Sequence, residues 1–338
     1  MTDVAVPTGT TGSTGTTGTT GSADSARKAL VQVRREVAKA VVGQDAAVSG
    51  ILIALLSRGH ILLEGVPGVA KTLLVRSLAA ALDIQTKRVQ FTPDLMPGDI
   101  TGSLIYDPHT AEFSFREGPV FTNLLLADEI NRTPPKTQAS LLEAMEERQV
   151  SVDGTTYVLE APFMVIATQN PIEMEGTYPL PEAQRDRFTA RLSMGYPSPQ
   201  AEVEMLAVHG ETDPLDALEP VADALEVRKL VEVVRDIHVG REVREYVVAL
   251  VSATRSAVDL RLGASPRAGL QLVRVAKARA ALAGRDYVLP DDVQALASAV
   301  LAHRLLATPE AQVARRLPED VVAGLVERTP LPSGARRR

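Results

Sequence analysis

The chain has 338 residues, of which 45% are hydrophobic and 23% charged, a profile typical of globular proteins with material for one large or two smaller domains. Its formal net charge of −6 argues against a general nucleic-acid binder. There is no cysteine and there are only 5 histidines, which excludes disulfides and argues against a zinc enzyme. No apolar run reaches the roughly 20 residues that span a bilayer, and the N-terminus lacks a secretory pattern, so we expect a cytoplasmic protein without membrane insertion.

The chain opens with a segment of low complexity. Residues Thr8–Ser22 consist only of Thr, Gly and Ser. Such a tract has no apolar side chains whose burial could offset the entropy of ordering it. We therefore expect residues 1–25 to form a disordered Thr/Gly-rich tail, either simply solvated or regulated by phosphorylation.

Residues 26–197 alternate between apolar runs and helical patterns. The expected helices include residues 72–82 and 135–148, and the third and fourth apolar runs have the continuous character of central strands covered on both faces. Alternation of this kind predicts a parallel sheet, here a five-stranded α/β core. The expected strands are His60–Gly65, Lys87–Phe91, Phe121–Glu129, Phe163–Thr168 and Phe188–Met194.

After residue 197 the strand patterns stop and helical periodicity continues. The expected helices are Glu202–His209, Ala222–Ile237, Arg241–Ser256, Pro266–Ala283 and Pro290–Leu305. Residues 198–338 are therefore predicted to form a second, small all-helical domain.

A candidate phosphate-binding loop, GVPGVAKT, lies between an expected strand and an expected helix. In that context the backbone N–H groups face a phosphate, Lys71 reaches its outer oxygens, and the Thr72 hydroxyl can bind Mg²⁺. Ala70 stands where a second glycine is usual, and alanine suits this position if its φ is negative. The predicted nucleotide-binding residues here are Gly65, Val66, Pro67, Gly68, Val69, Ala70, Lys71, Thr72 and Leu73.

A pair of carboxylates ends the third expected strand, in the segment NLLLADEI. Ligands gather at the carboxyl ends of strands in open α/β sheets, beside the phosphate loop. Asp128 can hold Mg²⁺ through its water shell and Glu129 can polarise the attacking water. Such a pair is common at strand ends, so its meaning comes from the phosphate loop that precedes it.

From about residue 30 to 325 the chain resembles the MoxR family of AAA+ ATPases. The resemblance is carried by VVGQD, GVPGVAKT, ADEINRTPPKTQASLLEAMEERQVS, ATQNPIEMEGTYPLPEAQRDRF and GASPRA. This family's loop commonly reads GVPGVAKT, so Ala70 agrees with it. The resemblance implies an AAA+ core with a helical lid that binds ATP and Mg²⁺ and hydrolyses ATP to ADP and phosphate.

The resemblance also implies residue roles. Val42, Gly43 and Gln44 resemble the segment that lines the adenine pocket. Asn170 resembles sensor 1, which orients the attacking water or the γ-phosphate, although an asparagine before proline can simply cap a turn.

Three further arginines have implied roles. Arg187 resembles the arginine finger that enters a neighbouring subunit's site, with Arg185 as the alternative. Arg267 resembles sensor 2, carried on the lid and reaching back to the nucleotide, although it could be a solvated helix residue. Arg132 is a weaker candidate for a second contact across the subunit boundary.

Two insertions read as β-hairpins, one around residues 103–115 and one with Asp153-Gly154 at its tip. Their positions resemble those of hairpins in MoxR proteins, the magnesium chelatase ATPase subunit and the MCM helicases. The tips lack Lys and Arg, which argues against contact with DNA phosphates. We expect the hairpins to contact a protein partner or to brace the assembly.

A trans-acting finger requires a homo-oligomer, by resemblance a hexameric ring, that remodels or activates protein partners in a chaperone-like way, with a von Willebrand factor A domain protein as the expected partner. Three alternatives stay open. They are a chelatase-type motor subunit, a DNA-translocating ATPase, and a nucleotide-gated scaffold without turnover.

Overall fold

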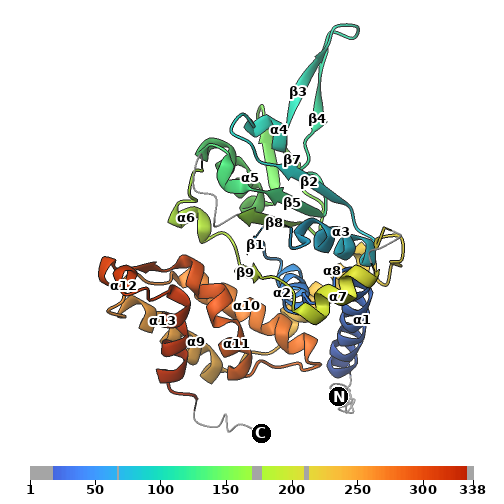
Figure 1. The fold of residues 1–338 in the computed structure, drawn as a ribbon. Helices are drawn as coiled ribbons and strands as arrows, with labels where there is room; N and C mark the ends of the chain where they lie inside the picture. The colour runs from blue at the N-terminus through green and yellow to red at the C-terminus, as the bar shows by residue number, and fades with distance from the viewer. Residues whose placement is uncertain (1–17, 67, 170–176, 209–212, 333–338) are drawn as a thin grey trace, which may run out of the picture.

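The computed structural model describes residues 18–66, 68–169, 177–208 and 213–332. Its centre is a five-stranded, fully parallel sheet in the order β2-β5-β8-β1-β9 (Figure 1). The strands are β1 (Ile61–Gly65), β2 (Thr86–Gln90), β5 (Leu124–Asp128), β8 (Met164–Gln169) and β9 (Ala190–Met194). The five predicted strands are confirmed, and the two continuously apolar runs, β5 and β8, occupy interior positions as expected for strands covered on both faces.

Successive side chains of each strand enter different cores because they point to opposite faces of the sheet. Leu126 and Ile166 belong to one core, whereas their neighbours Leu125 and Val165 belong to the other. All four are at most 2% exposed. The sheet is therefore the middle layer of the molecule.

Helices cover the two faces of the sheet. One face packs on α1 (Gly18–Ala40), α2 (Asp45–Leu56) and α3 (Lys71–Ala81), and the other packs on α5 (Pro135–Glu147). Helix α1 begins within the tract that the sequence led us to expect as a flexible tail. Shorter elements complete the core, namely α4 (Pro97–Thr101), the 3-10 helix η1 (Ile130–Arg132) and α6 (Glu182–Arg185).

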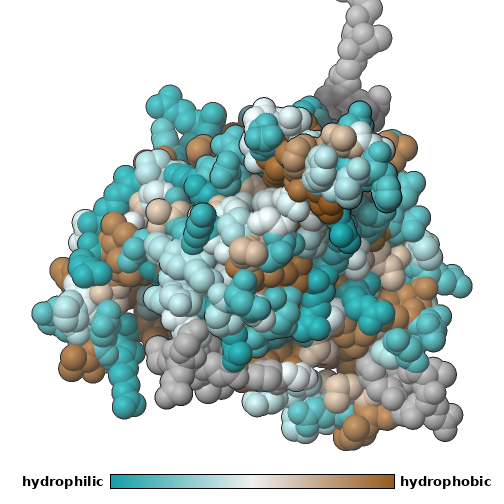
Figure 2. Space-filling model, turned by 90° about the horizontal axis from the view of Figure 1, so that it is seen from above, coloured by the Kyte–Doolittle hydropathy of each residue, from teal (hydrophilic) through white to brown (hydrophobic). Residues whose placement is uncertain are grey.

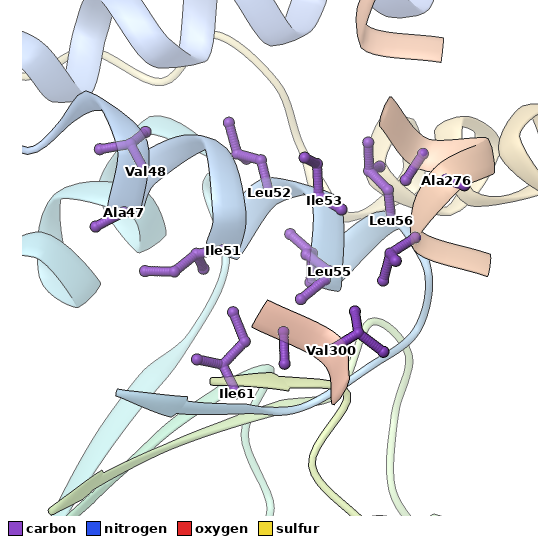
Figure 3. Close-up of a cluster of buried hydrophobic side chains, with 14 of the residues drawn as sticks. Ala47, Val48, Ile51, Leu52, Ile53, Leu55, Leu56, Ile61, Ala276 and Val300 are labelled. Carbon is purple, nitrogen blue, oxygen red and sulfur yellow. The ribbon is translucent and has the colours of Figure 1, made fainter. Parts of the chain in front are cut away.

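Helix α2 is buried on nearly all sides, which explains its apolar sequence DAAVSGILIALL. Figure 3 shows its side chains close to Ile61 of the sheet and to two residues from C-terminal helices, Ala276 and Val300. Leu52 is fully buried at 0% exposure. Helix α2 therefore joins the sheet to the C-terminal helices.

Both predicted hairpins are present. The first, β3 (Gly102–Asp107) and β4 (Glu112–Glu117), projects away from the body of the molecule (Figure 1). The second pairs β6 (Gln149–Val152) with β7 (Thr155–Val158), and its turn places Asp153 at φ 49° and Gly154 at φ 78°. Positive φ at both turn positions is the geometry that an Asp-Gly turn favours.

The C-terminal region is helical, as predicted, with one addition. Its main helices are α7 (Pro199–Val208), α8 (Ala224–Asp236), α9 (Arg241–Arg255), α10 (Pro266–Leu282), α11 (Pro290–Leu301), η2 (Ala302–Arg304), α12 (Pro309–Val313) and α13 (Pro318–Arg328). A short antiparallel pair, β10 (Leu260–Leu262) and β11 (Leu306–Ala307), was not predicted because two or three residues carry no periodicity. Helices α8, α9, α10, α11 and α13 share one continuous apolar core with the sheet.

Seen from above, the surface is mostly hydrophilic, with hydrophobic residues in small separate patches (Figure 2). Exposed large apolar side chains are spread over several elements, for example Met96 before α4 and Phe113 on β4. Among the described residues, no helix is both long enough and apolar enough to cross a bilayer.

Candidate active site

The phosphate loop leaves the carboxyl end of β1 and enters α3. Gly68 has φ 84°, and a Cβ added there would meet nothing within 4 Å, so the loop leaves open space on that side. The Nζ of Lys71 donates to the carbonyl oxygen of Gly65 at 2.7 Å, which holds the amine over the loop. Burial lowers the pKa of Lys71, and the charges of Asp128 and Glu129 oppose that shift. The Lys71 amine, the loop and the two carboxylates therefore form one site.

Ala70 departs from expectation. Alanine was expected to suit this position with a negative φ, and that expectation is wrong, because Ala70 precedes α3 with φ 61° and ψ 28°. A left-handed conformation costs a residue with a Cβ roughly 1–2 kcal/mol. The turn from strand to helix imposes this conformation, so the loop keeps its shape at a small cost in backbone strain.

The carboxylates are positioned by a threonine that the sequence reasoning did not single out. The buried Thr168 on β8 donates its hydroxyl to Oδ1 of Asp128, and the hydroxyl oxygen of Thr168 accepts the backbone N–H of Glu129 at 2.9 Å. Glu129 itself has φ 57°. One hydroxyl therefore fixes both the metal-binding candidate and the backbone of the candidate base.

Strand β2 contributes two more polar side chains that the sequence reasoning missed. Arg88 places Nη2 2.6 Å from Oδ2 of Asp128, and Gln90 donates to Oε2 of Glu129 at 2.8 Å. Arg132 pairs with the same Glu129 oxygen at 3.1 Å, within the same chain. The signal for Arg88 and Gln90 was their alternation on a strand, which puts both on the same face.

These groups surround a cavity of about 380 Å³, a volume in the usual range of small-molecule sites. Its lining comprises Gly68, Ala70, Lys71, Thr72, Leu73, Arg88, Asp128, Glu129 and Thr168. Thr72 and Asp128 offer the oxygen ligands that Mg²⁺ prefers. In the parts of the chain that the structure describes, no three His, Asp or Glu side chains gather to hold a metal. The donor set thus fits an ion completed by phosphate and water oxygens.

The predicted adenine segment lies next to the phosphate loop. Gln44 donates to the carbonyl of Gly195, just past β9, at 3.1 Å. A Cβ added to Gly65 would come within 2.7 Å of the carbonyl of Met194. Gly43 has φ 76° and also packs closely, because an added Cβ would lie 2.9 Å from Ala201. Residues 42–44 are therefore beside the start of the loop. Pro67 and Asn170, two predicted site residues, lie outside the described residues.

The chain matches two family models. The first, the ATPase family associated with various cellular activities (AAA), matches residues 60–190, and an AAA lid domain matches residues 252–323. The chain is 46% identical to the "Chaperone MoxR1" of Mycobacterium tuberculosis, over 88% of this chain and 81% of that one. It is 34% identical to the "Protein MoxR" of Methylorubrum extorquens, over 90% and 96%. A crystal structure of a protein assigned as an ATPase from Cytophaga hutchinsonii superposes with a TM-score of 0.87 at 39% identity, covering 93% and 98%.

The chain belongs to the MoxR family of AAA+ ATPases. The family and the structural neighbour make it an ATPase with an AAA+ core and a lid.

In this MoxR-family chain the two predicted arginines, Arg187 and Arg267, share one partner. Arg187 Nε lies 3.1 Å from one carboxylate oxygen of Glu146, and Arg267 Nη1 lies 2.8 Å from the other. Both arginines are partly exposed, at 31% and 39% of their side chains. They line a cleft with His60, whose pKa is lowered to about 4, mainly by burial. This "arginine cleft" contains residues from the core and from the lid.

The arginine cleft lies at the amino ends of the strands, away from the phosphate loop. Thr189, at the entry to β9, donates its N–H to the carbonyl of His60, at the entry to β1. The loop follows the other end of β1, five residues later, roughly 16 Å along an extended strand. Arg267 was expected to reach back to its own subunit's nucleotide, and instead it contacts Glu146 beside Arg187. The packing of α10 on the core places it there.

Arg185, the alternative finger, has different surroundings. Burial lowers its pKa, while Glu182 and Glu64 raise it and Arg191 lowers it. Glu64 is the residue of β1 just before Gly65. Arg185 and Arg187 therefore face different groups although only one residue separates them.

Proposed function

We propose that this ATPase works as a ring-shaped homo-oligomer, by family expectation a hexamer, in which each active site is shared between two subunits. In this proposal one subunit supplies Lys71, Thr72, Asp128 and Glu129; Thr72 and Asp128 would hold Mg²⁺, which would compensate phosphate charge. Glu129 orients and deprotonates the attacking water, and Asn170 assists it. The neighbour supplies Arg187 and Arg267, which neutralise charge that develops on the γ-phosphate.

The observation that carries this proposal is the position of the two arginines. They lie together, partly exposed, at the edge of the sheet opposite their own phosphate loop. Guanidinium groups that compensate phosphate charge must touch it, and roughly 16 Å of strand separates these from the loop of the same chain. In a ring, the arginines at the amino ends of one subunit's strands can face the phosphate loop of the neighbouring subunit.

The work that hydrolysis drives is, we propose, chaperone-like remodelling or activation of protein partners. The name of the M. tuberculosis relative, a chaperone, supports this. So does the projecting first hairpin, where Tyr106 and Phe113 are 49% and 68% exposed and pack on each other with ring centroids 5.1 Å apart. Apolar rings on a projecting tip favour contact with protein over phosphate. A partner with a von Willebrand factor A domain is the expectation from the family.

The test measures ATP turnover against protein concentration for the wild type, Glu129→Gln, Arg187→Ala and Arg185→Ala. We expect wild-type specific activity to rise with concentration, and Arg187→Ala to lower kcat by about 10³-fold or more, the usual effect of losing an arginine finger. Glu129→Gln should keep ATP binding. Mixing Arg187→Ala with Glu129→Gln should restore turnover, because mixed interfaces combine an intact site with an intact finger. A flat concentration dependence with no restoration on mixing would refute the shared site.

A further inference from the structure

The segment that carries Arg187 is bound to the lid by a buried guanidinium. Arg304, at the end of η2, has only 2% of its side chain exposed. Its Nε donates to Oδ1 of Asp186 at 2.8 Å. Asp186 is the residue immediately before Arg187, so a lid residue holds the neighbour of the finger.

The rest of this guanidinium binds mainly the backbone of the same segment. Its Nη2 donates to the carbonyl oxygens of Asp186, at 3.3 Å, and of Phe188. Its Nη1 reaches the carbonyl of Thr189 at 3.4 Å. The buried His303 adds a contact from Nε2 to the Phe188 oxygen at 3.2 Å, and Nε2 must carry the proton because a carbonyl can only accept.

The same aspartate reaches the helix that carries the second arginine. The hydroxyl of Ser265 lies 3.2 and 3.1 Å from the two oxygens of Asp186. Ser265 is the N-cap of α10 and accepts the N–H of Ala268 at 3.3 Å. Arg267 is in the first turn of that helix. Asp186 therefore connects the segment of Arg187, the start of α10 and Arg304.

Gln271 on α10 completes this "Arg304 cluster", defined as Asp186, Ser265, Gln271, His303 and Arg304. Burial lowers the pKa of Arg304 to about 10, while its bond to Asp186 opposes the shift, so the side chain is charged at neutral pH. Burying a charge is unfavourable before its contacts compensate, so such a residue is a poor device for stability alone. What this one does is fix the backbone of residues 186–189 against the lid.

Positional accuracy is what a trans-acting arginine needs. A displacement of about 1 Å at a catalytic group can cost roughly 10²-fold in rate. Arg187 and Arg267 are both within two residues of a member of the Arg304 cluster, and both share Glu146.

We propose that Arg304 is a positioning residue, through which the lid of each subunit sets the place of the two arginines that it presents to its neighbour's ATP. The proposal rests on the shared site proposed above. Under it, the position of a lid governs hydrolysis in the adjacent subunit, whereas ATP binding in its own subunit is independent of Arg304.

The experiment uses the full chain with Arg304→Gln and Arg304→Lys, and compares kcat, KM and the Kd of a fluorescent ATP analogue with the wild type. We expect Arg304→Gln to lower kcat about 10- to 100-fold, the usual effect of removing a supporting hydrogen-bond partner, with the Kd within about twofold. Arg304→Lys retains the charge without the planar fork and should recover part of kcat.

Mixing two variants distinguishes a positioning role of Arg304 from general damage to the fold. Arg304→Gln mixed with Glu129→Gln should turn over faster than either alone, because the first has an intact site and the second intact arginines. Arg304→Gln mixed with Arg187→Ala is the matched control and should recover nothing. If Arg304→Gln loses turnover and Glu129→Gln does not restore it, the residue is merely structural and the proposal fails.

Two outcomes distinguish this proposal from the one on which it rests. If Arg187→Ala loses turnover and Arg304→Gln keeps it, only the positioning role is refuted. If Arg187→Ala keeps full turnover, the shared site itself is refuted.

Should Arg304→Gln fail to fold, Ser265→Ala decides, since it removes only the hydroxyl beside Asp186 and one helix cap. Thr308→Ala removes the cap of α12 and serves as its control. The proposal requires kcat to fall about 2- to 10-fold in Ser265→Ala alone, as expected for the loss of one hydrogen bond, with restoration by Glu129→Gln. An unchanged kcat in Ser265→Ala would overturn it.

Discussion

The two charged regions of this molecule are built in different ways. The phosphate-loop site lies within one sheet, where Lys71, Asp128 and Thr168 come from neighbouring strands or the loop after them. The arginine cleft is assembled from distant segments, because Glu146 is in the core and Arg267 in the lid. All residues of the first region therefore belong to the core, whereas the second region includes a lid residue and depends on how the lid packs.

This difference predicts where a substitution acts. Changes in the phosphate-loop site should affect the subunit that carries them, and changes in the arginine cleft should affect its neighbour. The predictions below test the first region, so that the mixing experiments described above can be compared with them.

Among substitutions in the phosphate-loop site, Glu129→Gln is expected to have the largest effect. Removing the candidate base should lower kcat by about 10² to 10⁴-fold, the range for general acid–base catalysis, with the Kd for ATP nearly unchanged. Glu143→Gln, on the exposed side of α5, removes a carboxylate without this role and should keep wild-type turnover. Single-turnover hydrolysis of radiolabelled ATP measures both. A Glu129→Gln variant that hydrolyses ATP within a few-fold of the wild type would assign the base elsewhere.

Thr168→Val is expected to have an intermediate effect. Valine keeps the volume but removes the hydroxyl that donates to Oδ1 of Asp128, and it leaves the N–H of Glu129 without its acceptor. Hydrogen bonds that orient a metal ligand without touching the metal are worth about 10- to 100-fold in metal affinity or activity. We expect kcat to fall in that range and the Mg²⁺ concentration for half-maximal turnover to rise.

Thr168→Ser is the matched control, because it keeps the hydroxyl and should recover most of the activity. Equal activity in the valine and serine variants would show that the hydroxyl has no part in the site.

The sequence predicted the first region better than the second for a physical reason. Strands, the phosphate loop and the two carboxylates have local signatures, namely apolar runs, a glycine-rich turn and acidic residues at a strand end. Alternation on a strand places Arg88 and Gln90 on one face, but their contacts and that of Thr168 follow from the lateral order β2-β5-β8, which local patterns do not reveal.

The place of Arg267 was beyond local patterns too. Its motif identified the residue, but its contact with Glu146 depends on the packing of α10 against the core. For the same reason Asp186 and Arg304 were not singled out, because 118 residues separate Arg304 from the aspartate that it binds.

Ala70→Gly is expected to have the smallest effect, and it should stabilise the fold where the other substitutions impair activity. At φ 61° glycine is free of the steric cost that alanine bears, although it gains entropy in the unfolded chain, so the net stabilisation should be about 1 kcal/mol or less. Ala80→Gly, in the same helix but in ordinary helical conformation, should instead destabilise by about 1 kcal/mol. Denaturant titration of the nucleotide-free protein measures both. If the two glycine variants shift the midpoint in the same direction, the conformation of Ala70 is not a source of strain, and the loop tolerates alanine there without cost.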